Sequence, residues 1–158
     1  MTDPVLSQNM YVSKMLRLPL AFMTRVTDGV IDNDLDSLPK SKFLSYSTHD
    51  WTVAKLLLFL DADNGLFDVI PFASSVMLEL HSTEECASEE CFWVETIYNG
   101  MHLEFEGDCA DKIRCTYPEF MQMLQYKGFV NTNTQYEKEC AKKWQYHAGG
   151  QKDNFLYR

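Results

Sequence analysis

The dipeptide Asn99-Gly100 separates two runs of residues with alternating polarity, at 92–98 and 101–106. Both central residues of a type I′ turn need a positive φ, and asparagine followed by glycine adopts this geometry at the least cost. The sequence therefore predicts a β-hairpin over residues 92–106. Whatever else the chain forms, its fold contains two antiparallel strands.

Two further strands are predicted before this hairpin. In residues 74–81, the apolar residues Val76, Leu78 and Leu80 alternate with Met77, Glu79 and His81. This period of two indicates a half-buried strand. Residues 42–47 are typical of a short strand that ends in small polar residues and leads into a helix at Thr48-His49-Asp50.

Helices are predicted on both sides of these strands. The spacing of apolar residues in 5–28 favours either two helical pieces or one helix kinked at Pro19, with Leu6, Met10, Met15, Leu18, Phe22, Met23 and Val26 as its apolar positions. Residues 51–60 are apolar on nearly every face, so this helix is expected to be buried. A further helix is predicted over 117–124, with Thr116 as its N-cap and Pro118 in its first turn. The acidic stretch 28–39 is expected to be an exposed loop.

The bulk properties indicate one globular domain that binds neither nucleic acid nor a bilayer core. A chain of 158 residues with 46% hydrophobic and 23% charged residues is typical of one globular domain. Its net charge of -9 opposes contact with a polyanion. No run approaches the length needed to span a membrane, and the N-terminus has no signal-peptide pattern.

The five cysteines suggest local disulfides and no metal site. Cys86 and Cys91 are five residues apart, Cys109 and Cys115 are six apart, and Cys140 stands alone. This pattern is that of two short disulfide loops and one orphan thiol. The spacings are not those of zinc knuckles, and the acidic residues beside Cys86 would repel thiolates.

The segment Ser45 to Asp50 carries the one arrangement with chemical interest. It delivers His49 and Asp50 from a predicted strand end to a helix N-terminus, where free N–H groups favour anions such as phosphate. The alternative interpretation is structural, because aspartate is among the commonest helix caps. His81 and His102, on predicted strands, and His147, in the polar tail, are interpreted as ordinary surface or core residues.

Three blocks, LSYSTHDWTVAKLL, IPFASSVMLELH and FWVETIYNG, resemble in order and spacing the late region of the histidine acid phosphatases. This group includes prostatic and lysosomal acid phosphatases and phytases. The resemblance covers roughly residues 5–140. It implies an α/β fold that is the C-terminal portion of a three-layer domain, with a mixed sheet, a β-hairpin and flanking helices.

On this basis residues 1–158 form a single partial domain. Its parts are a helical segment and acidic loop (1–40), a strand-helix-strand core (41–106), and a disulfide loop, helix and tail (107–158). The resemblance also implies a Cys109–Cys115 disulfide and a late cysteine, Cys140, that pairs with the earlier half of such a protein. For this chain we predict the first pair, the pair Cys86–Cys91, and a free Cys140.

The resemblance implies phosphomonoester hydrolysis through a phosphohistidine. In this reaction Asp50 would be the proton donor and His49 would bind phosphate, without a metal or cofactor. A secretory, lysosomal or extracellular location is implied as well.

The chain also departs from the family pattern. The family's nucleophile lies in an Arg-His-Gly motif, and none of the four arginines here is followed by histidine. Trp51 replaces a small hydroxyl residue. We therefore expect either a piece of a longer enzyme, inactive alone, or a non-catalytic structural or interaction protein. An incomplete sheet would leave an open edge, so we expect either a protein partner there or a rearranged, compact edge.

Overall fold

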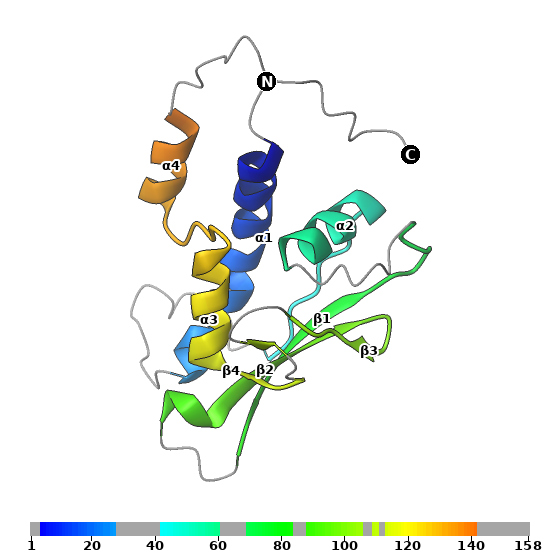
Figure 1. Ribbon diagram of the computed structural model, residues 1–158, viewed down its shortest axis with the longest axis vertical. Coiled ribbons are helices and arrows are strands. Elements are labelled where there is room, and N and C mark those ends of the chain that lie inside the picture. The colour runs from blue at the N-terminus through cyan, green and yellow to red at the C-terminus, as the bar shows by residue number, and fades with distance from the viewer. Residues whose placement is uncertain are drawn as a thin grey trace.

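A central strand pairs on both of its edges in the computed structural model, which describes residues 4–27, 42–60, 69–83, 88–105, 109–110 and 113–141. The elements are, in chain order, α1 (Pro4–Thr27), α2 (Asp50–Phe59), β1 (Val76–Ser82), a 3₁₀ turn (Glu89–Cys91), β2 (Phe92–Tyr98), β3 (Met101–His102), β4 (Cys115–Thr116), α3 (Tyr117–Tyr126) and α4 (Asn133–Ala141). Figure 1 shows their arrangement.

The sheet is antiparallel throughout its named strands. β1 pairs with the whole of β2, from Val76 opposite Tyr98 to Ser82 opposite Phe92. On the other edge of β2, β3 pairs near its end and β4 near its start. The expected α/β class with helices beside a sheet is confirmed at this coarse level, but the named strands pair only antiparallel and do not form the mixed sheet that was expected. The strand predicted over residues 42–47 does not join this sheet.

The hairpin at Asn99-Gly100 is confirmed. Asn99 has φ 49° and Gly100 has φ 85°, as a type I′ turn requires. Asn99 also ties the turn to the start of β1, because its side-chain oxygen accepts the Ser75 N–H at 2.8 Å. The second strand is shorter than predicted: β3 ends at His102, although the Leu103 N–H still donates to the Thr96 carbonyl at 2.8 Å.

One face of the sheet forms the core with the helices. The alternation predicted for β1 is confirmed, since the register places Val76, Leu78 and Leu80 beside the buried or nearly buried side chains of β2, namely Tyr98, Thr96 and Val94. Thr96 is 1% exposed, and its hydroxyl has no hydrogen-bond partner among the described residues.

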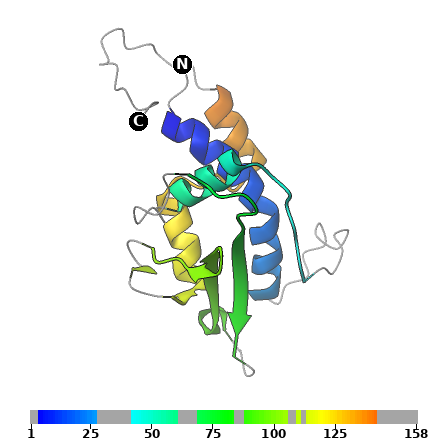
Figure 2. The ribbon, with the colours of Figure 1, turned by 90° about the vertical axis from the view of Figure 1, so that its right-hand side faces the viewer.

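Helices α1 and α3 lie side by side against this face (Figures 1 and 2) and run antiparallel. The start of α1 contacts the end of α3, where the Asn9 side-chain amide donates to the Lys127 carbonyl at 2.9 Å. The end of α1 contacts the start of α3, where the Thr24 and Tyr117 hydroxyls are hydrogen-bonded. The Tyr117 hydroxyl also lies 3.3 Å from the Leu20 carbonyl, to which it donates.

α1 is one continuous helix, with Pro19 inside it. Its buried stripe is Val12, Leu16, Leu20 and Met23, whereas the predicted positions Leu18 and Val26 are exposed. Apolar residues occur at helical spacing in both registers, so the sequence pattern alone did not select the face that packs.

α2 is half-buried, which corrects the expectation of a fully buried helix. Leu56, Leu57 and Phe59 face the core, but Trp51 is 63% exposed and Leu58 is 46% exposed. The helix contacts α1, and Trp51 and Leu58 stay accessible to solvent.

The predicted strand at 42–47 is wrong. We call residues 42–49 the approach segment, because they lead directly into α2. They belong to no strand, and every one of them is exposed. Figure 2 shows the segment, in cyan, as a separate trace outside the sheet. A strand forms only when a neighbour pairs with it, and the described residues place no neighbour there.

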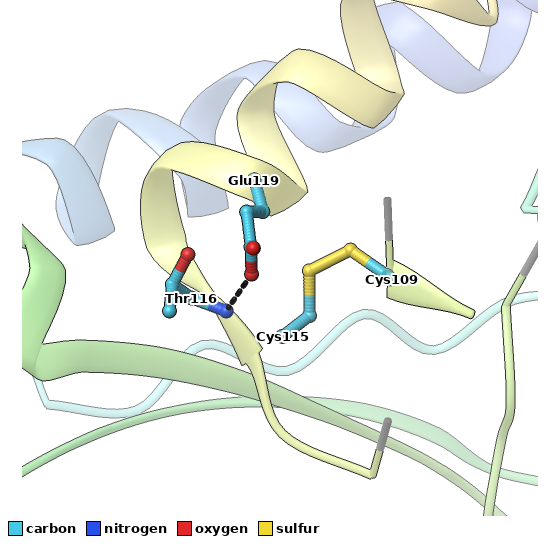
Figure 3. The surroundings of a disulfide bond; sticks show 4 residues. All are labelled: Cys109, Cys115, Thr116 and Glu119. Carbon is cyan, nitrogen blue, oxygen red and sulfur yellow. Dashed lines mark hydrogen bonds between the residues drawn. A yellow bond between two sulfur atoms is a disulfide. The ribbon is translucent and has the colours of Figure 1, made fainter. Parts of the chain in front are cut away.

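The Cys109–Cys115 disulfide is present, with its Cα atoms 5.2 Å apart. Figure 3 shows it close to the first turn of α3, where the Glu119 carboxylate accepts the Thr116 N–H at 3.1 Å. This half of a capping box confirms Thr116 as the N-cap and the predicted α3. Cys86 and the side chain of Cys140 lie outside the described residues, so the other two cysteine predictions remain predictions.

Two predicted segments, the acidic loop 28–39 and the tail with His147, lie outside the described residues. α4 was not predicted, because its sequence is polar with little periodicity. None of the described helices is both long and apolar enough to cross a membrane. In the described part of the chain, no strand pairs with the outer edge of β1.

Substitutions at two adjacent leucines test which side of α2 packs against the core. Leu57 is fully buried, so Leu57→Ala should lower the free energy of unfolding by about 2–5 kcal/mol through lost burial and an unfilled cavity. Leu58→Ala is the matched control and should cost roughly 1 kcal/mol or less, since Leu58 is half exposed. Urea denaturation of both variants measures the difference. Equal losses would show that α2 packs differently.

Candidate functional site

The His49-Asp50 pair lies where the approach segment enters α2. His49 is extended, with φ -97° and ψ 160°, and is the N-cap residue of the helix. Its carbonyl accepts the N–H of Thr52 at 2.9 Å, which closes the first helical turn. Asp50 is therefore the first helical residue and not the cap.

The Asp50 side chain is exposed and folds back on its own helix. Its Oδ1 atom accepts the backbone N–H of Trp51 at 2.7 Å. A carboxylate in this position also interacts favourably with the positive end of the helix dipole. These two interactions suffice to explain an aspartate here structurally, but they leave the second carboxylate oxygen available.

An open hollow of about 250 Å³ adjoins the pair, between α1, the approach segment and α2. Its lining residues are Tyr11, Lys14, Met15, Tyr46, Ser47, Thr48 and Thr52. Its surface is mainly apolar, although a lysine and several hydroxyl-bearing residues are among those that line it. His49 and Asp50 do not line it, so the structure places the two predicted site residues at its side and not within it.

Neighbouring side chains fix the walls of this hollow. The Tyr11 and Thr52 hydroxyls are 3.1 Å apart and hydrogen-bonded, which joins α1 to α2. The Lys55 ammonium group lies 4.6 Å from the Tyr11 ring centre and 5.4 Å from that of Trp51, within the range of cation–π contact. Partial burial raises the pKa of the Tyr46 hydroxyl, so this group is a neutral hydrogen-bond donor at neutral pH.

Two of the described arginines interact elsewhere. Arg17 on α1 donates to the Asn133 side chain at 2.5 Å. Arg114, before β4, lies beside Glu95 on the sheet. Both guanidinium groups therefore have partners other than Asp50.

A second cluster, which the sequence reasoning missed, covers the outer face of the sheet. We call it the outer-face cluster; it consists of Glu79, His81, Trp93, Glu95, His102 and Arg114. Its centre is the Glu95 carboxylate, whose side chain is 12% exposed. The Trp93 Nε1–H donates to it at 2.9 Å, the Arg114 Nε lies at 3.3 Å and the His102 Nδ1 at 3.5 Å.

The Trp93 ring is the second organising group of this cluster. His81 stacks on it with ring centres 5.6 Å apart, and the Arg114 guanidinium lies 4.9 Å from its centre. His81 also lies 3.1 Å from the Glu79 carboxylate. The Trp93 hydrogen bond has the largest effect and lowers the pKa of Glu95. Burial comes next and raises it, and the charges of His81, His102 and Arg114 each lower it further.

The hairpin register could have revealed this cluster. A period of two places Glu79 and His81 on the face of β1 opposite its apolar residues, and the type I′ turn sets His102 across from Ile97. The interpretation of His81 and His102 as surface residues is compatible with this position, but the sequence reasoning did not join them to Glu95. Among the described residues, no group of three or more histidine, cysteine or acidic side chains is arranged to hold a metal ion.

Comparison of this chain with protein-family models, with curated proteins and with solved structures finds no match. The resemblance of its three sequence blocks to histidine acid phosphatases therefore has no independent support.

Glu95 should stabilise the fold in a pH-dependent way. Because its folded-state pKa lies below the ordinary value of 4.5, its contribution is present above pH 4.5 and is lost as the pH falls through the lower, folded value. Glu95→Gln should cost about 1 kcal/mol at neutral pH, where it removes charged interactions, and should flatten the acid side of the stability profile.

Thermal or urea unfolding at a series of pH values measures this effect. Glu104→Gln, which changes an exposed glutamate of the same hairpin, is the matched control and should leave the profile almost unchanged. An acid profile of Glu95→Gln that parallels the unmodified chain would contradict the assignment.

Proposed function

We propose that this chain is the C-terminal part of a histidine acid phosphatase-like phosphomonoesterase, to which it contributes Asp50 as proton donor and His49 as a phosphate ligand. The observation that supports this most directly is the exposure of both side chains at the first turn of α2. Neither is used in the core, and both can approach a substrate. The resemblance of the surrounding sequence supports the same assignment.

Asp50 would perform one step of the reaction, the protonation of the leaving group. When the ester P–O bond breaks, the leaving alkoxide takes up the proton of a carboxylic acid, which contributes about 10²–10⁴-fold to such a step. His49 would donate a hydrogen bond to a phosphoryl oxygen. The attacking histidine and the arginines that stabilise the equatorial oxygens must come from polypeptide beyond the present 158 residues, so this chain is expected to be inactive alone.

The adjoining hollow supports a substrate position beside the pair. Lys14 and the hydroxyls of Ser47 and Thr48 line it, and they provide a positive charge and donors for an anionic group. A secretory, lysosomal or extracellular location belongs to the same proposal, and the Cys109–Cys115 disulfide is compatible with an oxidising compartment.

The alternative is a non-catalytic structural or interaction protein. The exposed approach segment favours it, as do the positions of Arg17 and Arg114, which lie away from Asp50 and interact with other residues. A fold can persist as a scaffold without its catalytic residues.

Under either function, the chain alone should not hydrolyse a generic phosphomonoester above background at acid pH. A substitution in a more complete protein separates the two functions. In a protein that also carries the nucleophile segment, Asp50→Asn should slow alkyl phosphates, whose leaving groups need a proton, far more than activated aryl phosphates. Ser45→Ala, in the same exposed segment, is the matched control and should alter neither rate. Equal slowing of both substrates by Asp50→Asn, or none, would contradict the proton-donor role and leave Asp50 with a structural role alone.

A further inference from the structure

Residues 44–48 of the approach segment pair with no strand in the described part of the chain. Residues 44–48 are exposed, belong to no helix or strand and run as a drawn-out trace toward α2 (Figure 2), and no backbone hydrogen bond joins them to another described residue. Large apolar side chains nevertheless occur along it, since Phe43 is 78% exposed, Tyr46 49% and Leu44 37%. An extended backbone of this kind presents alternating N–H and C=O groups, which another extended backbone can pair with.

We propose that this segment pairs with the same segment of a second copy of the chain, antiparallel and centred on Tyr46. In this register Tyr46 lies opposite Tyr46, Leu44 opposite Thr48, and Ser45 opposite Ser47. The segment is therefore its own complement, as a two-fold symmetric interface requires. The paired tyrosine rings provide an aromatic cross-strand contact, and the small serines allow close approach of the backbones.

The charges at the two ends of the segment select this arrangement. Lys42 precedes the extended residues and Asp50 follows them, and both side chains are exposed. Antiparallel pairing about Tyr46 brings Lys42 of each copy beside Asp50 of the other, so the interface carries two ion pairs. Parallel pairing would set lysine beside lysine and aspartate beside aspartate, which is unfavourable.

The strongly acidic character of the whole chain acts in the same direction. With a net charge of -9, two copies repel each other in most orientations. The approach segment is a place where opposite charges of two copies meet, so it fixes the register even though each exposed ion pair adds little energy. The contact is short, and the dimer is correspondingly weak and concentration-dependent. This inference goes beyond the proposed hydrolysis and does not depend on it.

Single cysteine substitutions test the register directly. In the proposed dimer the Cα atoms of the two Tyr46 residues lie about 4.5–5.5 Å apart, within the reach of a disulfide. Tyr46→Cys should therefore form a cross-linked dimer under mild oxidation. Thr48→Cys is the matched control: it is offset from its own copy by four residues, about 13 Å along the strand, and should not cross-link. Mass spectrometry of the linked peptide identifies the bond.

Charge exchange provides the second measurement, with sedimentation equilibrium from about 10 µM to 1 mM as the readout. Lys42→Asp and Asp50→Lys should each weaken the dimer by about tenfold, and the double variant, which restores opposite charges, should recover most of the loss. Circular dichroism checks that each variant is folded. Cross-linking at position 46 alone, with recovery in the double variant, supports the proposal. A monomer at all concentrations, or equal cross-linking at positions 46 and 48, overturns it.

Discussion

The pairing of β2 on both of its edges is the interaction on which the rest of this structure depends. β1 occupies one edge of β2 along its whole length, while β3 and β4 share the other. Because β2 is held from both sides, its alternate residues have fixed directions. Val94, Thr96 and Tyr98 face the helices, and Trp93 and Glu95 face outward. The direction of the neighbouring side chains on β1, β3 and β4 follows from this division.

Two different kinds of contact occupy the two faces. On the inner face, α1 and α3 cover the apolar residues and are joined by polar contacts at both of their ends. On the outer face, no described helix lies over the sheet, and charged and aromatic side chains from β1, β2 and β3 contact one another instead. An antiparallel sheet can carry one solvated face in this way, whereas a parallel sheet is usually covered on both.

The sequence predicted best where a local rule was sufficient. The Asn99-Gly100 turn, the alternation in β1 and the Thr116 cap each depend on residues within a few positions of one another. Prediction failed where a distant partner decided the outcome. Residues 42–47 have the composition of a strand but no neighbour to pair with, and α2 is apolar all round but packs on one side only. His49 and Asp50 lie at the start of a helix, as the local sequence indicated, yet their relation to the hollow depends on α1, which no local pattern could supply.

The hydroxyl of Thr96 has no hydrogen-bond partner among the described residues, and this lowers the stability of the fold. Threonine and valine have nearly the same shape, but a buried hydroxyl without a partner leaves a desolvation penalty of about 1–3 kcal/mol. The strand that organises the sheet therefore carries an unfavourable group at a buried position. Natural sequences are rarely optimised for stability, and this hydroxyl is one group at which the present sequence falls short.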